Sequence, residues 1–104
     1  MQELDDNIIR FYDVADGKVV SSLILYWVRL PSRYLGVIEE VKTEPKYRNQ
    51  GRATKLITLA LDKARELGLS CVELTVREDN EGAQHLYRNF GFFDRSNRAY
   101  RVNL

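Results

Sequence analysis

Apolar residues recur in two different ways along the chain, and the first way predicts strands. Residues 8–14 and 18–30 are rich in β-branched and aromatic side chains, and the Asp-Gly pair at 16–17 between them is typical of a two-residue hairpin turn. A third strand is predicted over about 35–43 and is ended by Pro45, because proline cannot donate to a ladder. The front of the chain is therefore expected to be antiparallel.

A helical period follows, in which apolar residues recur in steps of three and four. The residues on this stripe are Ala53, Leu56, Ile57, Ala60, Leu61, Ala64 and Leu67. Gly68 comes directly after the stripe and is a typical residue to end a helix. We therefore predict a crossover helix that ends at Gly68.

The last third of the chain predicts a strand, a short helix and a tail. The strand covers 71–76, and Asn80 then holds the position of a helix N-cap. One face of the short helix carries Ala83, Leu86, Tyr87 and Phe90, and Gly91 ends it. Residues 92–104 are expected to form one or two strands around a turn at 96–97. The order βββ-α-β-α-β predicts an α/β fold.

Composition narrows the class of protein. With 104 residues, of which 44% are hydrophobic and 30% charged, the chain is expected to be one soluble domain that covers residues 1–104. Its 16 Lys and Arg against 15 Asp and Glu give a net charge of +1, so neither nucleic acid nor a membrane is expected as a partner. The lone Cys71 excludes an intrachain disulfide, no Cys/His cluster has metal-ligand spacing, and the N-terminus does not resemble a signal peptide. We expect a cytoplasmic protein without a metal site.

The stretch from Tyr47 to Lys55, which reads YRNQGRATK, joins the third strand to the first helix and is a candidate anion site. A helix N-terminus presents unsatisfied N–H groups, and Gly51 would let an anion approach the backbone closely. The basic residues around it are Lys46, Arg48, Arg52 and Lys55. The stretch lacks the spacing of the nucleotide-hydrolase P-loop and the three glycines of the dinucleotide-binding fingerprint. On its own, a plain helix start with solvated basic side chains explains it equally well.

Two motifs lie on either side of the predicted fourth strand. The pattern Q/R-x-x-G-x-G/A is matched by residues 48–53, after a strand and at the start of a helix. A second pattern, roughly N-x-x-A-x-x-L-Y-x-x-x-G-F, is matched at every spacing by Asn80, Ala83, Leu86, Tyr87, Gly91 and Phe92. Together these motifs resemble those of the GNAT superfamily of acyl-CoA-dependent N-acetyltransferases. The resemblance covers residues 36–92, which is most of the chain.

The resemblance implies a central mixed, largely antiparallel sheet with two helices and a splayed parallel strand pair, residues 36–43 and 71–76. Acetyl-CoA would lie in the cleft between these strands. Backbone groups of Val41 and Thr43 would pair with its pantetheine arm, and an N–H in the same stretch is the candidate oxyanion donor. The pyrophosphate would rest on the amides of Arg48, Asn49, Gln50, Gly51, Arg52, Ala53 and Thr54. Asn80 holds the position whose side chain contacts the pantetheine region in the family, although a plain N-cap is an equal explanation.

The resemblance also implies an acid and a base, because the amine must lose a proton and the thiolate must gain one. Tyr87 stands at the position that the family often uses as the general acid; the alternative is that it only fills the apolar stripe of its helix. Glu39 and Glu40 are the candidate bases and, as neighbours on a strand, are expected to point to opposite faces. Strict alternation would put Glu39 on the face of Val41 and Thr43, so Glu39 is favoured. The alternative is that either glutamate is only a solvated strand charge.

The leading hypothesis is an N-acetyltransferase that moves an acetyl group from acetyl-CoA to a primary amine by direct attack in a ternary complex. Usual members of the family begin with a strand and two helices that help to build the acceptor site, whereas only residues 1–7 precede the first predicted strand here. Three explanations are open: a minimal enzyme with an open acceptor site for a small-molecule, peptide or protein amine; an enzyme completed by a second subunit in a homodimer; or a non-catalytic acyl-CoA-binding module. The sequence does not name the acceptor.

Overall fold

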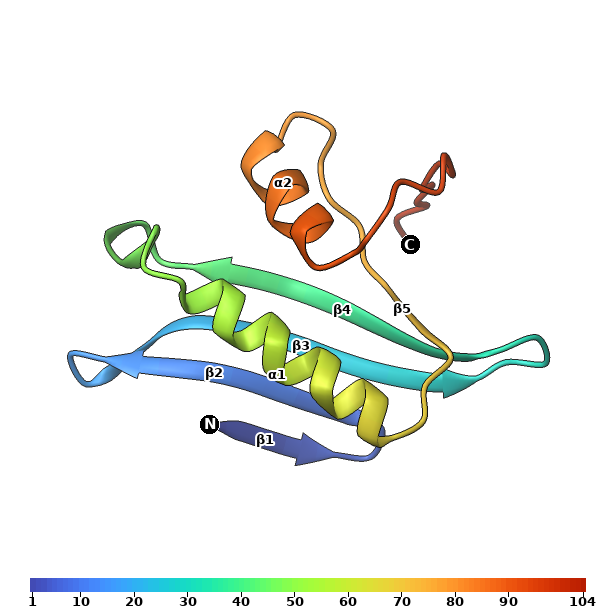
Figure 1. The fold of residues 1–104 in the computed structure, drawn as a ribbon, viewed down its shortest axis with the longest axis horizontal. Helices are drawn as coiled ribbons and strands as arrows, with labels where there is room; N and C mark the ends of the chain where they lie inside the picture. The colour runs from blue at the N-terminus through green and yellow to red at the C-terminus, as the bar shows by residue number, and fades with distance from the viewer.

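The computed structural model describes the backbone of residues 1–104 and the side chains of all of them except 3–5. Figure 1 shows the order of the elements. They are β1 (Gln2–Asp5), β2 (Ile8–Ala15), β3 (Lys18–Arg29), β4 (Tyr34–Thr43), a 3₁₀ turn η1 (Pro45–Tyr47), α1 (Arg52–Glu66), β5 (Cys71–Glu73) and α2 (Glu81–Asn89).

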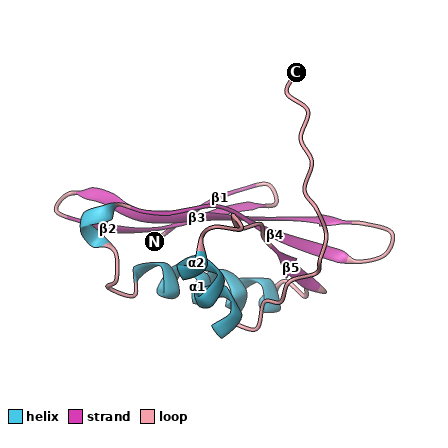
Figure 2. Ribbon diagram, turned by 90° about the horizontal axis from the view of Figure 1, so that it is seen from above, coloured by secondary structure: helices cyan, strands magenta, loops and turns pink.

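The strands form one mixed sheet in the order β1-β2-β3-β4-β5. All neighbours are antiparallel except β4 and β5, which α1 connects as a parallel pair. Figure 2 shows both helices on one face of this sheet. The predicted α/β fold, with a largely antiparallel sheet, one parallel strand pair and two helices, is confirmed.

The hydrophobic core lies between the sheet and α1, with Tyr87 of α2 at its border. Its buried members are Ile9, Phe11, Leu23, Leu25, Ile38, Leu56, Ile57, Ala60 and Tyr87. This set comes from alternate residues of the strands and from every third or fourth residue of α1. The spacing of apolar residues in the sequence predicts both patterns.

The turns and helix ends that the sequence marks also form. Asp16 and Gly17 both have positive φ, 53° and 76°, as the predicted two-residue hairpin turn requires. Gly68 and Gly91 follow the helices with φ of 74° and 95°. Asn80 caps α2, since its side chain accepts a hydrogen bond from the amide of Ala83. These features are local, and each is confirmed.

Three strand predictions differ from the structure. Residues 2–5 form β1 by pairing with β2, although their composition does not predict a strand, because backbone pairing rather than side-chain type forms this edge. The predicted strand 71–76 is regular only over β5, where it pairs with β4. Residues 92–104 form no strand, because β5 offers a partner edge of only three residues. Figure 2 shows this tail extending away from the helices.

A β-bulge interrupts β4. Ser22 pairs with Lys42 and Ile24 with Glu39, so one residue of β3 opposes two of β4, residues 40 and 41. Ile38 and Val41 therefore both contact the core beneath the sheet, although they are three residues apart. The alternation predicted for this strand, with Glu39 and Val41 on one face, is wrong because of the extra residue.

Close packing of the parallel pair depends on Gly36. A Cβ added there would lie 2.7 Å from Leu69 Cδ1 and 3.3 Å from Val72 Cγ2. These distances are shorter than side chains normally allow, so the absent side chain lets β5 approach β4. The ladder then ends with the pair Val37 and Glu73, and the two chain segments separate.

Candidate active site

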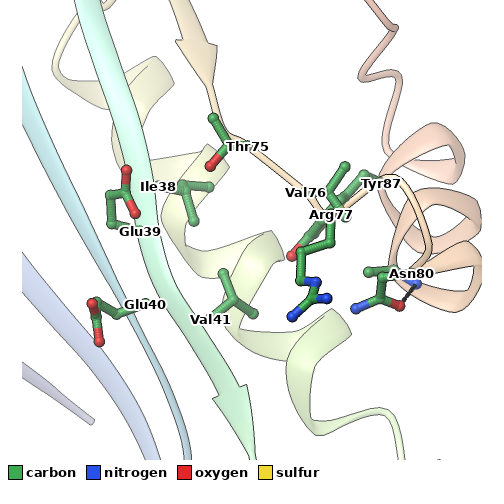
Figure 3. Close-up of a pocket in the computed structure, with 10 residues that line it drawn as sticks. Ile38, Glu39, Glu40, Val41, Thr75, Val76, Arg77, Asn80 and Tyr87 are labelled. Atoms are coloured by element: carbon green, nitrogen blue, oxygen red, sulfur yellow. Dashed lines mark hydrogen bonds between the residues drawn. The ribbon is translucent and has the colours of Figure 1, made fainter. Parts of the chain in front are cut away.

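A cleft of about 250 Å³ opens where β4 and the segment after β5 separate. Figure 3 shows its walls, one from β4 and the other from residues 75–80 and α2. The lining residues are Ile38, Glu39, Glu40, Val41, Thr75, Val76, Arg77, Asn80, Ala83 and Tyr87. The structure therefore brings five sequence-predicted site residues to one cleft.

The cleft edge of β4 offers backbone groups. Pairing with β5 covers only residues 35–37, so residues 38–43 have no strand partner on this side. An extended ligand placed here can bond to them as an added strand would. The side chain of Thr43 is turned to Ser21, with 2.8 Å between the two hydroxyl oxygens, and its carbonyl accepts from Arg48 Nε at 3.1 Å.

Tyr87 lies on the buried face of α2 with 8% of its surface exposed. Its ring meets Phe92 edge to face, with centroids 5.9 Å apart. Figure 3 shows it extending from α2 toward the side of β4 that carries Ile38 and Val41. Burial raises the pKa of Tyr87, so the phenol keeps its proton throughout the neutral range.

Asn80 combines a position on the cleft with a structural bond. Its side-chain oxygen accepts from the amide of Ala83 at 3.1 Å, which closes the first turn of α2. In the described residues, its amide nitrogen has no hydrogen-bond partner, and Figure 3 shows the side chain beside Arg77. The N-cap is therefore present and leaves the side-chain NH2 group, with its two N–H donors, for a ligand.

The two glutamates are exposed and do not contact Tyr87. Figure 3 shows both on the side of β4 away from Tyr87 and Asn80, because the bulge removes simple alternation. Glu40 adopts a left-handed backbone with φ of 56°, which is unusual for a residue with a side chain. Neither carboxylate has a hydrogen bond or ion pair to a described residue.

The N-terminus of α1 is open. Gly51 is its N-cap, with φ of 75°, and no side chain caps it. The first intrahelical bond runs from the amide of Lys55 to the carbonyl of Gly51, so the amides of residues 52–54 have no acceptor within the helix. A Cβ added at Gly51 would meet nothing within 4 Å, so the space beside the N-cap residue is open.

The basic side chains near this N-terminus differ in how far they are already paired. Arg52 donates to Gln50 at 2.9 Å and forms an ion pair with Asp13 at 2.7 Å. Burial raises the pKa of Asp13, but the hydrogen bond from Arg52 and the charges of Lys55 and Arg52 outweigh burial and lower it overall. Lys55 has no ion pair in the described residues. Arg52 is therefore neutralised, and Lys55 remains available to an anion.

Two residues of this region were not predicted from the sequence. Arg77 lines the cleft and pairs with Asp79 through two contacts of 3.2 Å. Arg77 is the first basic residue after the predicted strand 71–76, and this position is the sequence feature that could have indicated its place at the cleft. Asp13 pairs with Arg52 from 39 residues away, and no local pattern indicates this contact.

The described residues contain no group of three or more His, Cys, Asp or Glu side chains arranged to hold a metal ion. Within the same residues, neither helix has the length and apolar composition that a membrane crossing needs.

A profile of the acetyltransferase (GNAT) family matches residues 2–92. This match covers most of the 104 residues, and the chain therefore belongs to the acetyltransferase (GNAT) family.

Curated relatives carry acetyltransferase names. N-alpha-acetyltransferase 30 of Schizosaccharomyces pombe is 38% identical over 71 residues, which cover 68% of this chain and 45% of that protein. Mycothiol acetyltransferase of Beutenbergia cavernae is 32% identical over 81 residues, 78% of this chain and 26% of that protein. An uncharacterized N-acetyltransferase of Methanocaldococcus jannaschii is 34% identical over 67 residues, 64% of this chain and 30% of that protein. The chain thus spans less than half the length of each.

Solved structures share the fold at low sequence identity. A transcriptional regulator from Bacillus halodurans C-125 matches with a TM-score of 0.85 and 22% identity, over 96% of this chain and 68% of that one. AAC(6′)-Iy, in complex with the bisubstrate analog CoA-S-monomethyl-acetylneamine, matches with a TM-score of 0.80 and 17% identity, over 96% and 71%. These likenesses concern the fold alone.

Proposed function

We propose that the protein is an N-acetyltransferase that transfers an acetyl group from acetyl-CoA to a primary amine by direct attack in a ternary complex. The observation that carries the proposal is the cleft between β4 and residues 75–80, in a chain of the GNAT family. Unpaired strand backbone and a buried phenol line this cleft, and an open helix N-terminus follows in the chain beyond the end of β4.

The chain has groups that suit each part of the coenzyme. The pyrophosphate would accept from the amides of residues 48–54, with Lys55 adding charge. The pantetheine arm would pair along β4 at Val41 and Thr43, and the free amide nitrogen of Asn80 would donate to it. Acetyl-CoA would supply the acetyl group as a thioester, whose carbonyl carbon receives the amine nitrogen while the C–S bond breaks.

Tyr87 would protonate the departing thiolate. Its raised pKa guarantees that the proton is present at neutral pH, but it also makes the phenol a weaker acid than a thiol, for which the reference pKa is about 8.5. Proton transfer from the phenol to the thiolate is therefore uphill, and it is completed only when the phenolate regains a proton from solvent. A role for Tyr87 thus depends on its position in the cleft rather than on its acidity.

The amine must lose a proton before or during attack, because a lysine-type amine is charged below a pH of about 10.4. Glu39 and Glu40 are the candidate bases, acting directly or through a water molecule from the exposed side of β4, because the bulge removes the alternation that favoured Glu39. An unpaired backbone N–H at the bulge would stabilise the oxyanion.

The test combines binding and turnover on the wild-type chain. Acetyl-CoA at millimolar concentration should raise the thermal midpoint, and free thiol should appear when a panel of small amines, peptides and proteins is added. No rise in the midpoint would contradict coenzyme binding. A rise without thiol release across the panel, with Tyr87→Phe indistinguishable from wild type, would identify a non-catalytic acyl-CoA-binding module instead.

A further inference from the structure

The segment between β4 and α1, residues 44–51, is tied to the tip of the β2–β3 hairpin; we call this segment the coenzyme loop. Tyr47, in the middle of the loop, is 6% exposed and donates its hydroxyl to the carboxylate of Asp16 in the hairpin turn. Lys18, on the same hairpin, forms an ion pair of 3.0 Å with Glu44 of the loop. The loop is thus held from outside by residues more than 25 positions earlier in the chain.

The ring of Tyr47 is also the centre of a cluster of cations. The guanidinium carbon of Arg52 lies 5.3 Å from the ring centroid, and the amines of Lys46 and Lys18 lie 5.6 Å and 5.8 Å from it. Arg52 is at the same time paired with Asp13 of β2. Hairpin, loop and first turn of α1 therefore meet at one aromatic ring.

The conformation of the coenzyme loop explains why such restraint is needed. Asn49 and Gly51 both have positive φ, 61° and 75°, and the amides that follow have no acceptor within the helix. An unrestrained loop would leave this arrangement readily, and a ligand would then have to supply the free energy of ordering it. Tyr47 lies outside the main core cluster, so its contacts hold the loop rather than the sheet.

We infer that Tyr47 and Asp16 are positioning residues, which hold the coenzyme loop in its anion-binding conformation without touching the coenzyme. The inference rests on the proposed function, since it assigns the loop to the coenzyme pyrophosphate. It adds a part of the chain that neither family motif contains: the hairpin tip acts on the site through the hydrogen bond between Tyr47 and Asp16, beside the ion pair of Lys18 with Glu44.

The test removes this hydrogen bond from each side. Tyr47→Phe keeps the ring and loses the donor, and Asp16→Gly loses the acceptor in a residue type that tolerates positive φ. Each variant should raise the dissociation constant of coenzyme A, measured by calorimetry well below the unfolding transition, by roughly fivefold to tenfold. The double variant should bind no more weakly than either single one, because both remove one contact. Tyr12→Phe, which changes a tyrosine on β2 outside the loop contacts, should bind like wild type.

A second readout separates positioning from general loss of structure. KM for acetyl-CoA should rise while kcat and KM for the amine stay at wild-type values, and amide hydrogen exchange should accelerate in residues 48–54 of the ligand-free variants. If wild type binds coenzyme A and both variants bind equally well, the inference is wrong and the proposed function stands. If wild type does not bind, the proposed function fails, and the inference fails with it. Additive losses in the double variant would also overturn it, because the two residues would then act separately.

Discussion

The two helices begin in opposite ways. α1 starts at a glycine in left-handed conformation, with no side-chain cap and no acidic residue in its first turn. α2 starts at Asn80, whose side chain accepts from the amide of Ala83, and it has Glu81 in its first turn. The positive end of α2 is therefore satisfied within the chain, while that of α1 is left for an external anion.

The two helices also have different proposed roles in the site. α1 contributes its backbone, since its open amides are the candidate phosphate site. α2 contributes a side chain, since Tyr87 lies near its C-terminal end, two turns from the cap. In this proposal the open N-terminus of α1 binds the phosphates, and the capped helix α2 carries the proposed general acid. Substitutions in either helix therefore test the comparison.

The largest effect should come from closing the N-terminus of α1. Gly51→Glu places a carboxylate and a side chain at the open amides, and we expect the rise in thermal midpoint with acetyl-CoA to disappear. Gly68→Glu is the matched control, because Gly68 has nearly the same φ of 74°, lies in equally open space and sits at the other end of α1. Both variants should lose about 1–2 kcal/mol of stability from the left-handed position. A full ligand-induced shift in Gly51→Glu would contradict the phosphate site.

The side chain of α2 that we propose as the general acid, Tyr87, should give the next largest effect. Tyr87→Phe should lower kcat by about 10²-fold and leave the dissociation constant of acetyl-CoA near the wild-type value. Because burial raises the pKa of Tyr87, wild-type activity should persist up to a pH of about 10 and fall above it, and the residual activity of the Phe variant should lack this fall. Tyr100→Phe, on a tail residue that is 90% exposed, is the control. Unchanged turnover in Tyr87→Phe would reduce Tyr87 to a core residue.

A smaller effect tests the cap of α2. Asn80→Ala should lower the free energy of unfolding by about 1 kcal/mol, because the amide of Ala83 loses its acceptor. Asn80→Asp keeps the acceptor and places negative charge at a helix N-terminus, so its stability should equal or exceed that of wild type. It should nevertheless bind acetyl-CoA several-fold more weakly, since it lacks the amide donor. Wild-type affinity in Asn80→Asp would show that Asn80 is only a cap.

The smallest effect concerns the cation in the first turn of α1. Arg52 is unfavourable beside a helix N-terminus, and Asp13 offsets its charge. The pKa of Asp13 is lowered in the folded state, so its contribution is complete above the unfolded value of about 3.9 and is lost as pH falls through the folded value. Wild type should exceed Asp13→Asn by about 1 kcal/mol in unfolding free energy between pH 5 and 7. Chemical denaturation should show the gap closing below about pH 4, and a gap independent of pH would contradict the ionic origin.

Much of the fold was predictable because its signals are local. The Asp-Gly turn, the caps at Gly68, Asn80 and Gly91, and the helical stripe of α1 are each encoded within a few residues. The predicted cleft residues at 39–41, 80 and 87 also lie together, because the parallel strand pair and α2 were placed correctly.

What escaped prediction depends on distant parts of the chain. The pairing of Arg52 with Asp13 and of Tyr47 with Asp16 joins segments more than 30 residues apart. β1 forms because it pairs with β2. β5 ends at Glu73 because β4 and the segment after β5 separate there. The bulge at residues 40–41 is a property of the β3–β4 pair rather than of either strand. Sequence patterns describe single elements, whereas these features arise where two elements meet.

The bulge also makes the length of β4 matter in a way that substitutions cannot reveal. Ile38 and Val41 lie three positions apart and still point to the same face of the sheet, because the bulge adds one residue between them. Deleting Glu40 would remove the extra residue and restore strict alternation. Val41 would then follow Ile38 by two positions and stay on the core face, whereas deleting a residue in the regular part of β4 would turn every following side chain to the other face of the sheet. The site is thus specified by the parity of a strand as well as by its residues, and β4 should tolerate the loss of one residue at the bulge better than a loss elsewhere along the strand.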